Sequence, residues 1–314
     1  MGEHDRRQGA QIIQAGGHVS MREFDFYSPE TVPEACKVLA QHKDSVAIVA
    51  GGTDLVLELN ERKISPAVIV DVKKLKELEY IRIKDGIVHI GALTTHASIA
   101  ADPYIKEHVK ILYTACAEIG SPQIRNLGTI GGNLATSSVA GDGVCALTTL
   151  YSSVVLTSQR GTRTMKLMDF FAGEGYDKRN ALEADELLTE VFFEAPDDHT
   201  ATAFYKLAKR KSLAISVIGG GMAVKVDEDG VCTWASMRGG CLGRYPLQFK
   251  EAEKLLEGQK LTLAQMQKTL PILHDTVLEI NRSRPWSVFY KKESVQGVFN
   301  KLFAELLDQL QPYV

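Results

Sequence analysis

Two short glycine-rich segments place the strongest constraint on how this chain can fold. The first is AGGTD at residues 50–54, and the second is GTIGGN at residues 128–133. Each combines glycines with small polar residues, so backbone N–H groups are left unshielded, which suits an anion such as a phosphate. A single glycine pair is more simply explained by a turn that needs a positive φ. Two loops of the same kind, about 80 residues apart, are hard to reconcile with two unrelated turns.

The residues around the first loop predict a strand before the loop and a helix after it. Residues 46–50 form an apolar, β-branched run, and the residues after Asp54 can start a helix. Two such loops from different subdomains could hold a pyrophosphate from opposite sides, with the side chains of Thr53, Thr129 and Asn133 adding hydrogen bonds. Neither loop matches the GxGxxG or the GxxxxGK[ST] pattern, so a different nucleotide-binding fold is implied.

Composition limits the class of protein and its partners. With 314 residues, 45% hydrophobic and 24% charged, the chain is long enough for two or three subdomains with their own cores. Its net charge of −3 argues against nucleic acid as a partner. We expect no membrane span, because no apolar run approaches the roughly 20 residues needed. Residues 1–20 are polar without a signal region, so we expect a flexible extension and a cytoplasmic protein.

Cysteine and histidine spacing predicts no metal site. The five cysteines are an odd number without CxxC spacing, so neither a disulfide framework nor a zinc or iron–sulfur site is indicated. Each cysteine is expected to be a small buried hydrophobe. The eight histidines are scattered, without the spacing of metal ligands.

Periodicity predicts an α/β arrangement in the N-terminal half. Thr31 to Glu34 (TVPE) fits a capping box at the start of a helix. Residues 66–72 and 87–93 read as strands, and residues 109–119 read as a helix.

The C-terminal third predicts a separate domain with a three-stranded antiparallel sheet packed on helices. Its strands extend from about residue 212 to 241 with a hairpin turn at 227–230, and Gly219 to Gly221 mark a bend or close approach. Helical segments are expected at about 247–258, 263–281 and 294–311. No catalytic constellation is present in this part, so its expected role is structural.

Several segments occur in the order and spacing of one family. They are AGGTD at 50–54, IGALTTH at 90–96, SPQIRNLGTIGGN at 121–133, Asp142, DELLTEV at 185–191 and FYKLAKR at 204–210. The chain resembles the FAD-binding medium subunit of the molybdenum hydroxylases, the group that includes bacterial xanthine, nicotinate and carbon monoxide dehydrogenases. The resemblance covers residues 21 to about 305.

The resemblance implies an α+β protein with α/β subdomains. The expected fold is the two-subdomain FAD-binding fold of the vanillyl-alcohol-oxidase/p-cresol-methylhydroxylase type, followed by the C-terminal domain. The implied boundaries are 21–78 and 79–198 for the two FAD-binding subdomains and 199–314 for the C-terminal domain, after the extension at 1–20.

The resemblance also implies a set of residues that bind a non-covalent FAD. They are Ile48, Val49, Ala50, Gly51, Gly52, Thr53, Asp54, Leu55, Gly120, Thr129, Ile130, Gly131, Gly132, Asn133, Asp142, Leu188 and Lys206. Leu188 would pack on the flavin ring and Lys206 would stabilise negative charge on the reduced flavin. Gly131→Val is expected to abolish FAD retention while leaving the fold largely intact. His96 is read as a helix-start residue and not as a covalent flavin anchor.

The implied function is electron transfer within a multi-subunit enzyme. Substrate would be oxidised at molybdopterin on a large subunit, and electrons would pass through [2Fe-2S] clusters on a small subunit to this FAD and then to NAD or another acceptor. The assembly would be a dimer of heterotrimers, and this chain would carry no catalytic residue.

Two alternatives remain open at this point. The first is a self-contained flavin oxidase or dehydrogenase of the vanillyl-alcohol-oxidase type, which would need its own acid/base group in a substrate cavity. The second is a non-enzymatic nucleotide-binding or assembly protein in which both glycine loops are structural. A yellow purified protein would exclude the second alternative, and substrate oxidation by the isolated chain would favour the first.

Overall fold

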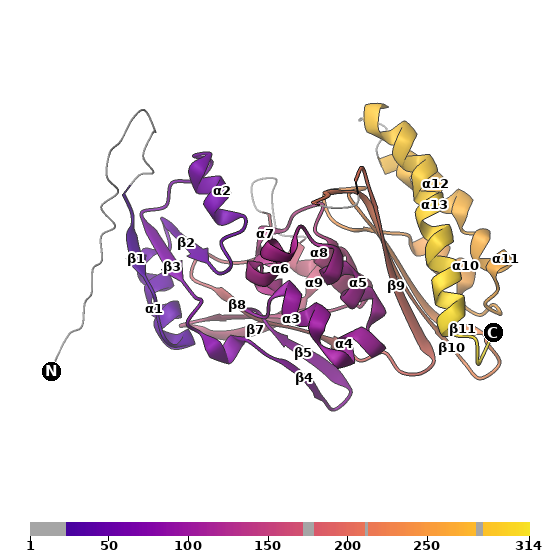
Figure 1. Cartoon of the computed structure of the whole chain (residues 1–314), viewed down its shortest axis with the longest axis horizontal. Helices are drawn as coiled ribbons and strands as arrows, with labels where there is room; N and C mark the ends of the chain where they lie inside the picture. The colour runs from indigo at the N-terminus through magenta and orange to yellow at the C-terminus, as the bar shows by residue number, and fades with distance from the viewer. Residues whose placement is uncertain (1–22, 172–178, 211–212, 281–284) are drawn as a thin grey trace.

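A computed structural model describes residues 23–171, 179–210, 213–280 and 285–314 (Figure 1). The predicted extension at residues 1–20 lies outside these ranges. The described residues form three β-sheets that follow one another along the chain and across the molecule from the indigo end to the yellow end.

The first sheet is small and parallel. It has the order β1-β3-β2, from Asp25–Tyr27, Val68–Asp71 and Val46–Val49. Helix α1 (Val32–His42) packs on it, while α2 (Leu55–Asn60) follows the first glycine loop and η1 (Lys76–Leu78) follows β3. Thr31 caps α1 by accepting from the Glu34 N–H at 3.4 Å, which confirms this helix start. Glu34 reaches back one residue further than a standard capping box, to the Glu30 N–H at 2.9 Å.

The second sheet is antiparallel and has five strands in the order β4-β5-β8-β6-β7. They are β4 (Ile81–Lys84), β5 (Ile87–Gly91), β6 (Ser153–Ser158), β7 (Gly161–Lys166) and β8 (Leu187–Glu194). Between β5 and β6 come α3 (His96–Ala101), α4 (Pro103–His108), α5 (Lys110–Glu118), α6 (Pro122–Leu127), α7 (Ile130–Thr136) and α8 (Asp142–Thr149), and α9 (Leu167–Phe171) follows β7.

The third sheet is antiparallel with the order β12-β11-β10-β9. Its strands are β9 (Thr200–Ala208), β10 (Ser216–Val226), β11 (Cys232–Gly240) and β12 (Leu247–Gln248). The sheet therefore has a fourth, two-residue strand, and its first strand lies before residue 212, where the strands were expected to begin. Its helices are α10 (Lys250–Leu256), α11 (Leu263–Gln267), α12 (Leu270–Ile280) and α13 (Pro285–Gln309).

Three helices in this region differ from the prediction. The segment expected to be helical at about 247–258 begins with strand β12, and α10 starts only at Lys250. The expected helix at 263–281 is two helices, because Pro271 has no N–H to continue α11 and fits only in the first turn of α12. Helix α13 begins at Pro285, nine residues before the expected start at Ser294.

Helices cover both faces of the third sheet. Helix α13 packs on β9 and β10 from one side, and α5 and α8 pack on β9, β10 and β11 from the other (Figure 1). The glycines of β10 permit this approach, since a Cβ on Gly220 would lie 2.4 Å from Val298 and one on Gly221 would lie 2.4 Å from Thr149. The helices therefore approach β10 closely at these glycines, which was one of the two predictions for Gly219 to Gly221.

Each sheet has its own cluster of buried apolar side chains. The clusters mix at their borders, since Leu187 of the second sheet packs with the first. On this basis we propose the division at 21–78, 79–198 and 199–314. No helix among the described residues combines the length and the apolar character needed to cross a bilayer.

Candidate functional site

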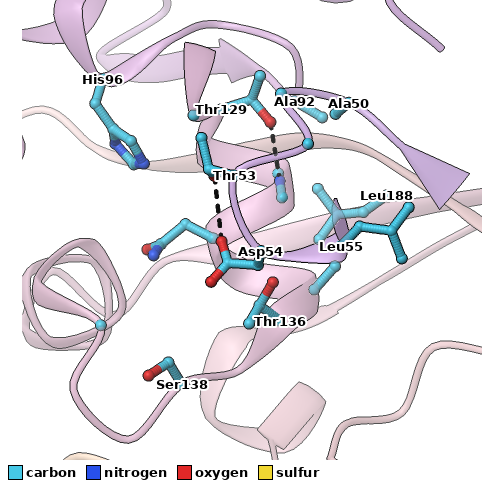
Figure 2. Close-up of a pocket in the computed structure, with 18 of the residues that line it drawn as sticks. Ala50, Thr53, Asp54, Leu55, Ala92, His96, Thr129, Thr136, Ser138 and Leu188 are labelled. Atoms are coloured by element: carbon cyan, nitrogen blue, oxygen red, sulfur yellow. Dashed lines mark hydrogen bonds between the residues drawn. The ribbon is translucent and has the colours of Figure 1, made fainter. Parts of the chain in front are cut away.

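A cavity of about 690 Å³ is lined by residues from all three proposed units, which are residues 21–78 (first unit), 79–198 (second unit) and 199–314 (third unit). The first loop, the α6–α7 connection, the start of α8 and the neighbouring ends of β9 and β10 all contribute to its wall. Fifteen of the residues predicted to bind FAD line it: Ile48, Ala50, Gly51, Gly52, Thr53, Asp54, Leu55, Gly120, Thr129, Gly131, Gly132, Asn133, Asp142, Leu188 and Lys206. Figure 2 shows part of this lining, with the first loop facing Thr129 and the α7 region.

Two of the predicted residues, Val49 and Ile130, are not part of the lining. Ile130 is fully buried in the core of the second unit. Val49 is the last residue of β2, and its side chain packs near Gly52. Their predicted contact with the cofactor remains a prediction.

The first glycine loop leaves its backbone donors open. The N–H groups of Gly51, Gly52 and Thr53 donate to no other described residue. Gly52 has a φ of 73°, which favours glycine, while a Cβ on Gly51 would lie 2.0 Å from the Leu127 carbonyl oxygen. The backbone requirement for glycine is thus confirmed in this loop, and its open N–H groups leave anion binding there as a prediction.

The second glycine loop differs, because the N–H groups of Ile130, Gly131 and Gly132 are already used. The N–H groups of Ile130 and Gly131 donate to the carbonyls of Thr94 and Ala92, at 3.0 and 2.8 Å. The Gly132 N–H donates at 3.1 Å to Thr129 Oγ1, which caps α7 (Figure 2). The expectation of two equivalent backbone anion sites is thus wrong.

Side chains replace those backbone donors in the second loop. The Thr129 hydroxyl can still donate its proton, since its oxygen is the acceptor in the cap. The Asn133 Oδ1 atom is buried without a hydrogen-bond partner. An unpaired buried Oδ1 is an acceptor and needs a hydrogen-bond donor, so within this amide it is the Nδ2 group that could donate to a phosphate oxygen.

Gly131 is required by the packing of the protein itself. A Cβ at this position would lie 2.6 Å from the Ala92 Cβ and 2.8 Å from the Ala92 carbonyl oxygen. A valine there would push α7 away from the end of β5. The expectation that Gly131→Val spares the fold is therefore wrong, and that variant would not isolate a contact with phosphate.

A buried ion pair closes the other end of the cavity. Lys206 Nζ lies 2.6 Å from Asp142 Oδ2 and 3.1 Å from the Glu118 carbonyl oxygen, and Ser216 Oγ donates to Asp142 Oδ1 at 2.5 Å. Burial raises the pKa of the Asp142 carboxyl, while Lys206 and Ser216 oppose that rise. The charge of Lys206 is thus already matched inside the protein, and its predicted contact with the flavin ring remains a prediction.

His96 lies under the second loop as the first residue of α3, as predicted. It lines the cavity, although only 3% of it is exposed. Burial, with the positive charge of Arg125 as the smaller cause, lowers the pKa of His96 to about 4. The imidazole is therefore neutral near pH 7, and it provides no positive charge for a phosphate.

This burial predicts a pH dependence of stability. Because the folded pKa is about 4, the unfolded chain binds a proton at His96 between about pH 6.5 and 4 while the folded chain does not. The free energy of unfolding should fall as the pH falls through this window, by up to about 3 kcal/mol from this residue. Urea unfolding of the wild type and His96→Gln at several pH values tests this. Parallel pH profiles of the two proteins would contradict it.

Sequence reasoning missed two polar residues of this site. Ser216 reaches Asp142 because β10 pairs with β9 in a register that sets Ser216 opposite Ala208, two residues after Lys206. Arg179 lines the cavity next to α2 and forms an ion pair with Glu58 at 3.1 Å. Neither residue stands in a motif, so a single sequence contains no signal for them.

The described wall of the cavity combines hydrogen-bond donors with apolar side chains. One end of the cavity has open N–H groups and hydroxyls, and apolar side chains such as Leu188 and Leu187 contribute elsewhere to the wall. No group of metal-ligating side chains occurs in the part of the chain that the structure describes. Four cysteines are buried and Cys241 is partly buried, and all five are free thiols.

Comparisons with known proteins agree with this geometry. The profile of a family described as the FAD binding domain in molybdopterin dehydrogenase matches residues 22–195, and the CO dehydrogenase flavoprotein C-terminal domain matches residues 203–306. The nicotinate dehydrogenase FAD-subunit of Eubacterium barkeri is 66% identical over 292 residues, which cover 93% of this chain and 98% of that protein. The caffeine dehydrogenase subunit beta of Pseudomonas sp. (strain CBB1) is 31% identical over 238 residues, covering 75% and 79%.

The fold has a counterpart among solved structures. A chain of the carbon monoxide dehydrogenase from Hydrogenophaga pseudoflava superposes with a TM-score of 0.81 at 22% identity, covering 93% of this chain and 99% of that chain. This likeness and the two family profiles confirm the predicted fold class: an FAD-binding domain followed by a domain with an antiparallel sheet and helices.

Proposed function

Because this chain belongs to the family of FAD-binding medium subunits of the molybdenum hydroxylases, we propose that it holds FAD without a covalent bond and transfers electrons within a multi-subunit dehydrogenase. The observation that carries the proposal is the single cavity wall that unites the open first loop, the Asn133 amide and the Asp142–Lys206 pair. When bound, FAD can accept electrons one at a time and release them as a pair.

Different residues of the cavity would bind different parts of the cofactor. The open N–H groups of the first loop, with Thr129 and Asn133, would bind the diphosphate. Leu188, which is 4% exposed on β8, would pack against the flavin ring. Lys206, held by Asp142, would keep a positive charge near the ring without being free to move.

The partners follow from the family, and they agree with the described residues, among which no group of metal-ligating side chains occurs. We propose a large molybdopterin subunit and a small subunit with [2Fe-2S] clusters, joined to this chain as a dimer of heterotrimers, with NAD or another compound as the acceptor. The relatives named above are subunits of dehydrogenases, which speaks against a self-contained flavin oxidase. The five free thiols fit a reducing compartment such as the cytoplasm.

Nicotinate is the first substrate to test on the complex. The support is the identity of 66% to the FAD-subunit of a nicotinate dehydrogenase along nearly its whole length. Since the site of substrate oxidation would lie on the large subunit, this chain alone should not oxidise nicotinate.

Native mass spectrometry of the complex from its own host tests the proposal. We expect this chain with two further subunits that carry molybdopterin and iron–sulfur clusters, and release of intact FAD on denaturation. The chain expressed alone serves as the control, since it should be yellow but inactive. A colourless chain, a covalently attached flavin, or nicotinate oxidation by the isolated chain would contradict the proposal.

A further inference from the structure

An exposed ion pair at the cavity edge joins the first unit to the second. Arg179 Nη1 lies 3.1 Å from Glu58 Oε1, and both residues line the cavity. Glu58 belongs to α2, directly after the first loop, while Arg179 stands in the connection between α9 and β8. The ion pair therefore connects α2, which follows the first loop, to the second unit.

The backbone beside Arg179 is fixed, although its side chain is not. The Asn180 side chain donates to the Ala135 carbonyl at 2.7 Å and to Ser137 Oγ at 2.9 Å, both near the end of α7. Arg179 itself is 62% exposed at its side chain. The guanidinium can thus reorient while its Cα stays anchored beside α7.

The position of Glu58 brings that guanidinium close to the first loop. Residues three and four apart on a helix lie roughly 5–6 Å from each other at Cβ, so Glu58 is a neighbour of Asp54 and Leu55. A guanidinium bound to Glu58 is therefore about one helical turn from the open N–H groups of the loop, within reach of a rotating arginine side chain.

The charges of the cavity leave Arg179 as the available cation. Five carboxylate side chains line the described wall: Asp54, Glu58, Asp142, Glu183 and Glu186. Among lysines and arginines, the described wall has Lys206 and Arg179. Lys206 is only 7% exposed at its side chain and is bound to Asp142, whereas the side chain of Arg179 is 62% exposed and its partner Glu58 is 25% exposed. Among the described residues of the wall, Arg179 is therefore the mobile cation that a diphosphate beside the first loop could meet.

We propose that Arg179 is an anion-binding residue that exchanges Glu58 for the diphosphate oxygens of the bound cofactor. This inference rests on the proposed function, because it takes the ligand to be a flavin dinucleotide. A guanidinium binds phosphate oxygens through two parallel hydrogen bonds, and the loop donors would hold the same phosphate, so the diphosphate should outcompete the single contact of Arg179 with the Glu58 carboxylate. Glu58 then competes with the cofactor for Arg179, and it binds the guanidinium when the cofactor is absent.

The two partners of the pair should have opposite effects on FAD affinity. FAD and riboflavin are titrated into the flavin-free protein at low and high salt, for the wild type, Arg179→Gln, Arg179→Lys and Glu58→Gln. We expect Arg179→Gln to raise the Kd for FAD about tenfold, with a weaker salt dependence, and Arg179→Lys to lose less. Glu58→Gln should lower the Kd for FAD severalfold, because Arg179 is released. Riboflavin, which has no phosphate, should bind all four proteins equally.

Each outcome bears on the proposal. If Arg179→Gln and Glu58→Gln weaken FAD binding equally, the pair is only a strap between two units and the proposal fails. An unchanged Kd in Arg179→Gln, or an equal loss of riboflavin binding, overturns it as well. A wild type that binds no FAD refutes the proposed function itself, which distinguishes the two failures. Thermal melts show that each variant is folded, as expected for two exposed side chains.

Discussion

Gly51→Ala should strongly reduce FAD retention while the protein still folds. The added methyl group would lie 2.0 Å from the Leu127 carbonyl oxygen, so the first loop and the α6–α7 connection must move apart. Without cofactor they can do so, because neither segment depends on the other for its own hydrogen bonds. Binding FAD would bring them back together against that collision, at a cost of roughly 1–3 kcal/mol, as for overpacked cores. The Kd for FAD should therefore rise about tenfold to a hundredfold.

The FAD content of purified protein and titration of the flavin-free form measure this effect. Gly297→Ala is the matched control, because it adds the same methyl group on α13 with no atom within 4 Å. It should leave the flavin content unchanged. A Gly51→Ala protein with normal flavin content would show that the close approach of the two segments is not needed for binding.

Lys206→Met should destabilise the protein more than any surface substitution. It would leave the Asp142 carboxylate, whose side chain is 5% exposed, with Ser216 as its remaining side-chain partner. Removing one member of a buried pair costs about 3–5 kcal/mol. At about 2–4 °C for each kcal/mol, the Tm should fall by roughly 6–20 °C.

Acidification should lessen that loss. Burial already raises the pKa of Asp142, and without Lys206 the pKa would rise further. A carboxyl with a raised folded pKa favours folding below its unfolded pKa and loses that contribution as the pH rises through the folded value. The difference in Tm between Lys206→Met and the wild type should therefore be largest near pH 7 and smaller at acid pH.

Two further proteins make this prediction specific. The double variant Asp142→Asn/Lys206→Met removes both charges and should recover most of the lost Tm. Lys63→Met breaks an exposed pair with Glu61, with 64% of the Lys63 side chain in solvent, and should leave the Tm unchanged. If Lys206→Met melted like Lys63→Met, the buried pair would have no role in stability.

Local signals predicted their elements well. Helix α1 begins where its capping threonine stands, and α3 begins at His96 after the capping Thr95. The glycines of β10 lie at a close approach of helices, as expected. Such features depend on a few consecutive residues, so the sequence carries the necessary information.

Long-range contacts account for the failures in the second glycine loop. Gly131 resembled a phosphate contact in sequence, but its position is set by Ala92, about 40 residues earlier. The break between α11 and α12 and the early start of α13 have a local cause instead, because Pro271 and Pro285 stand in the first turns of α12 and α13.

The sequence by itself determined the family, the fold class and most of the cavity wall. The two rare glycine loops and their spacing can be recognised in the sequence without knowing any contact in the folded chain. Only the tertiary structure decided what each loop can still bind. In the second loop the N–H groups of Ile130 and Gly131 donate to Thr94 and Ala92, while the N–H groups of Gly51 to Thr53 in the first loop remain open. The same holds for Ser216 and Arg179, whose partners come from strand register and from a helix more than a hundred residues away. A hydrogen-bond donor has one proton to give, and only the folded chain shows whether that proton is already in use.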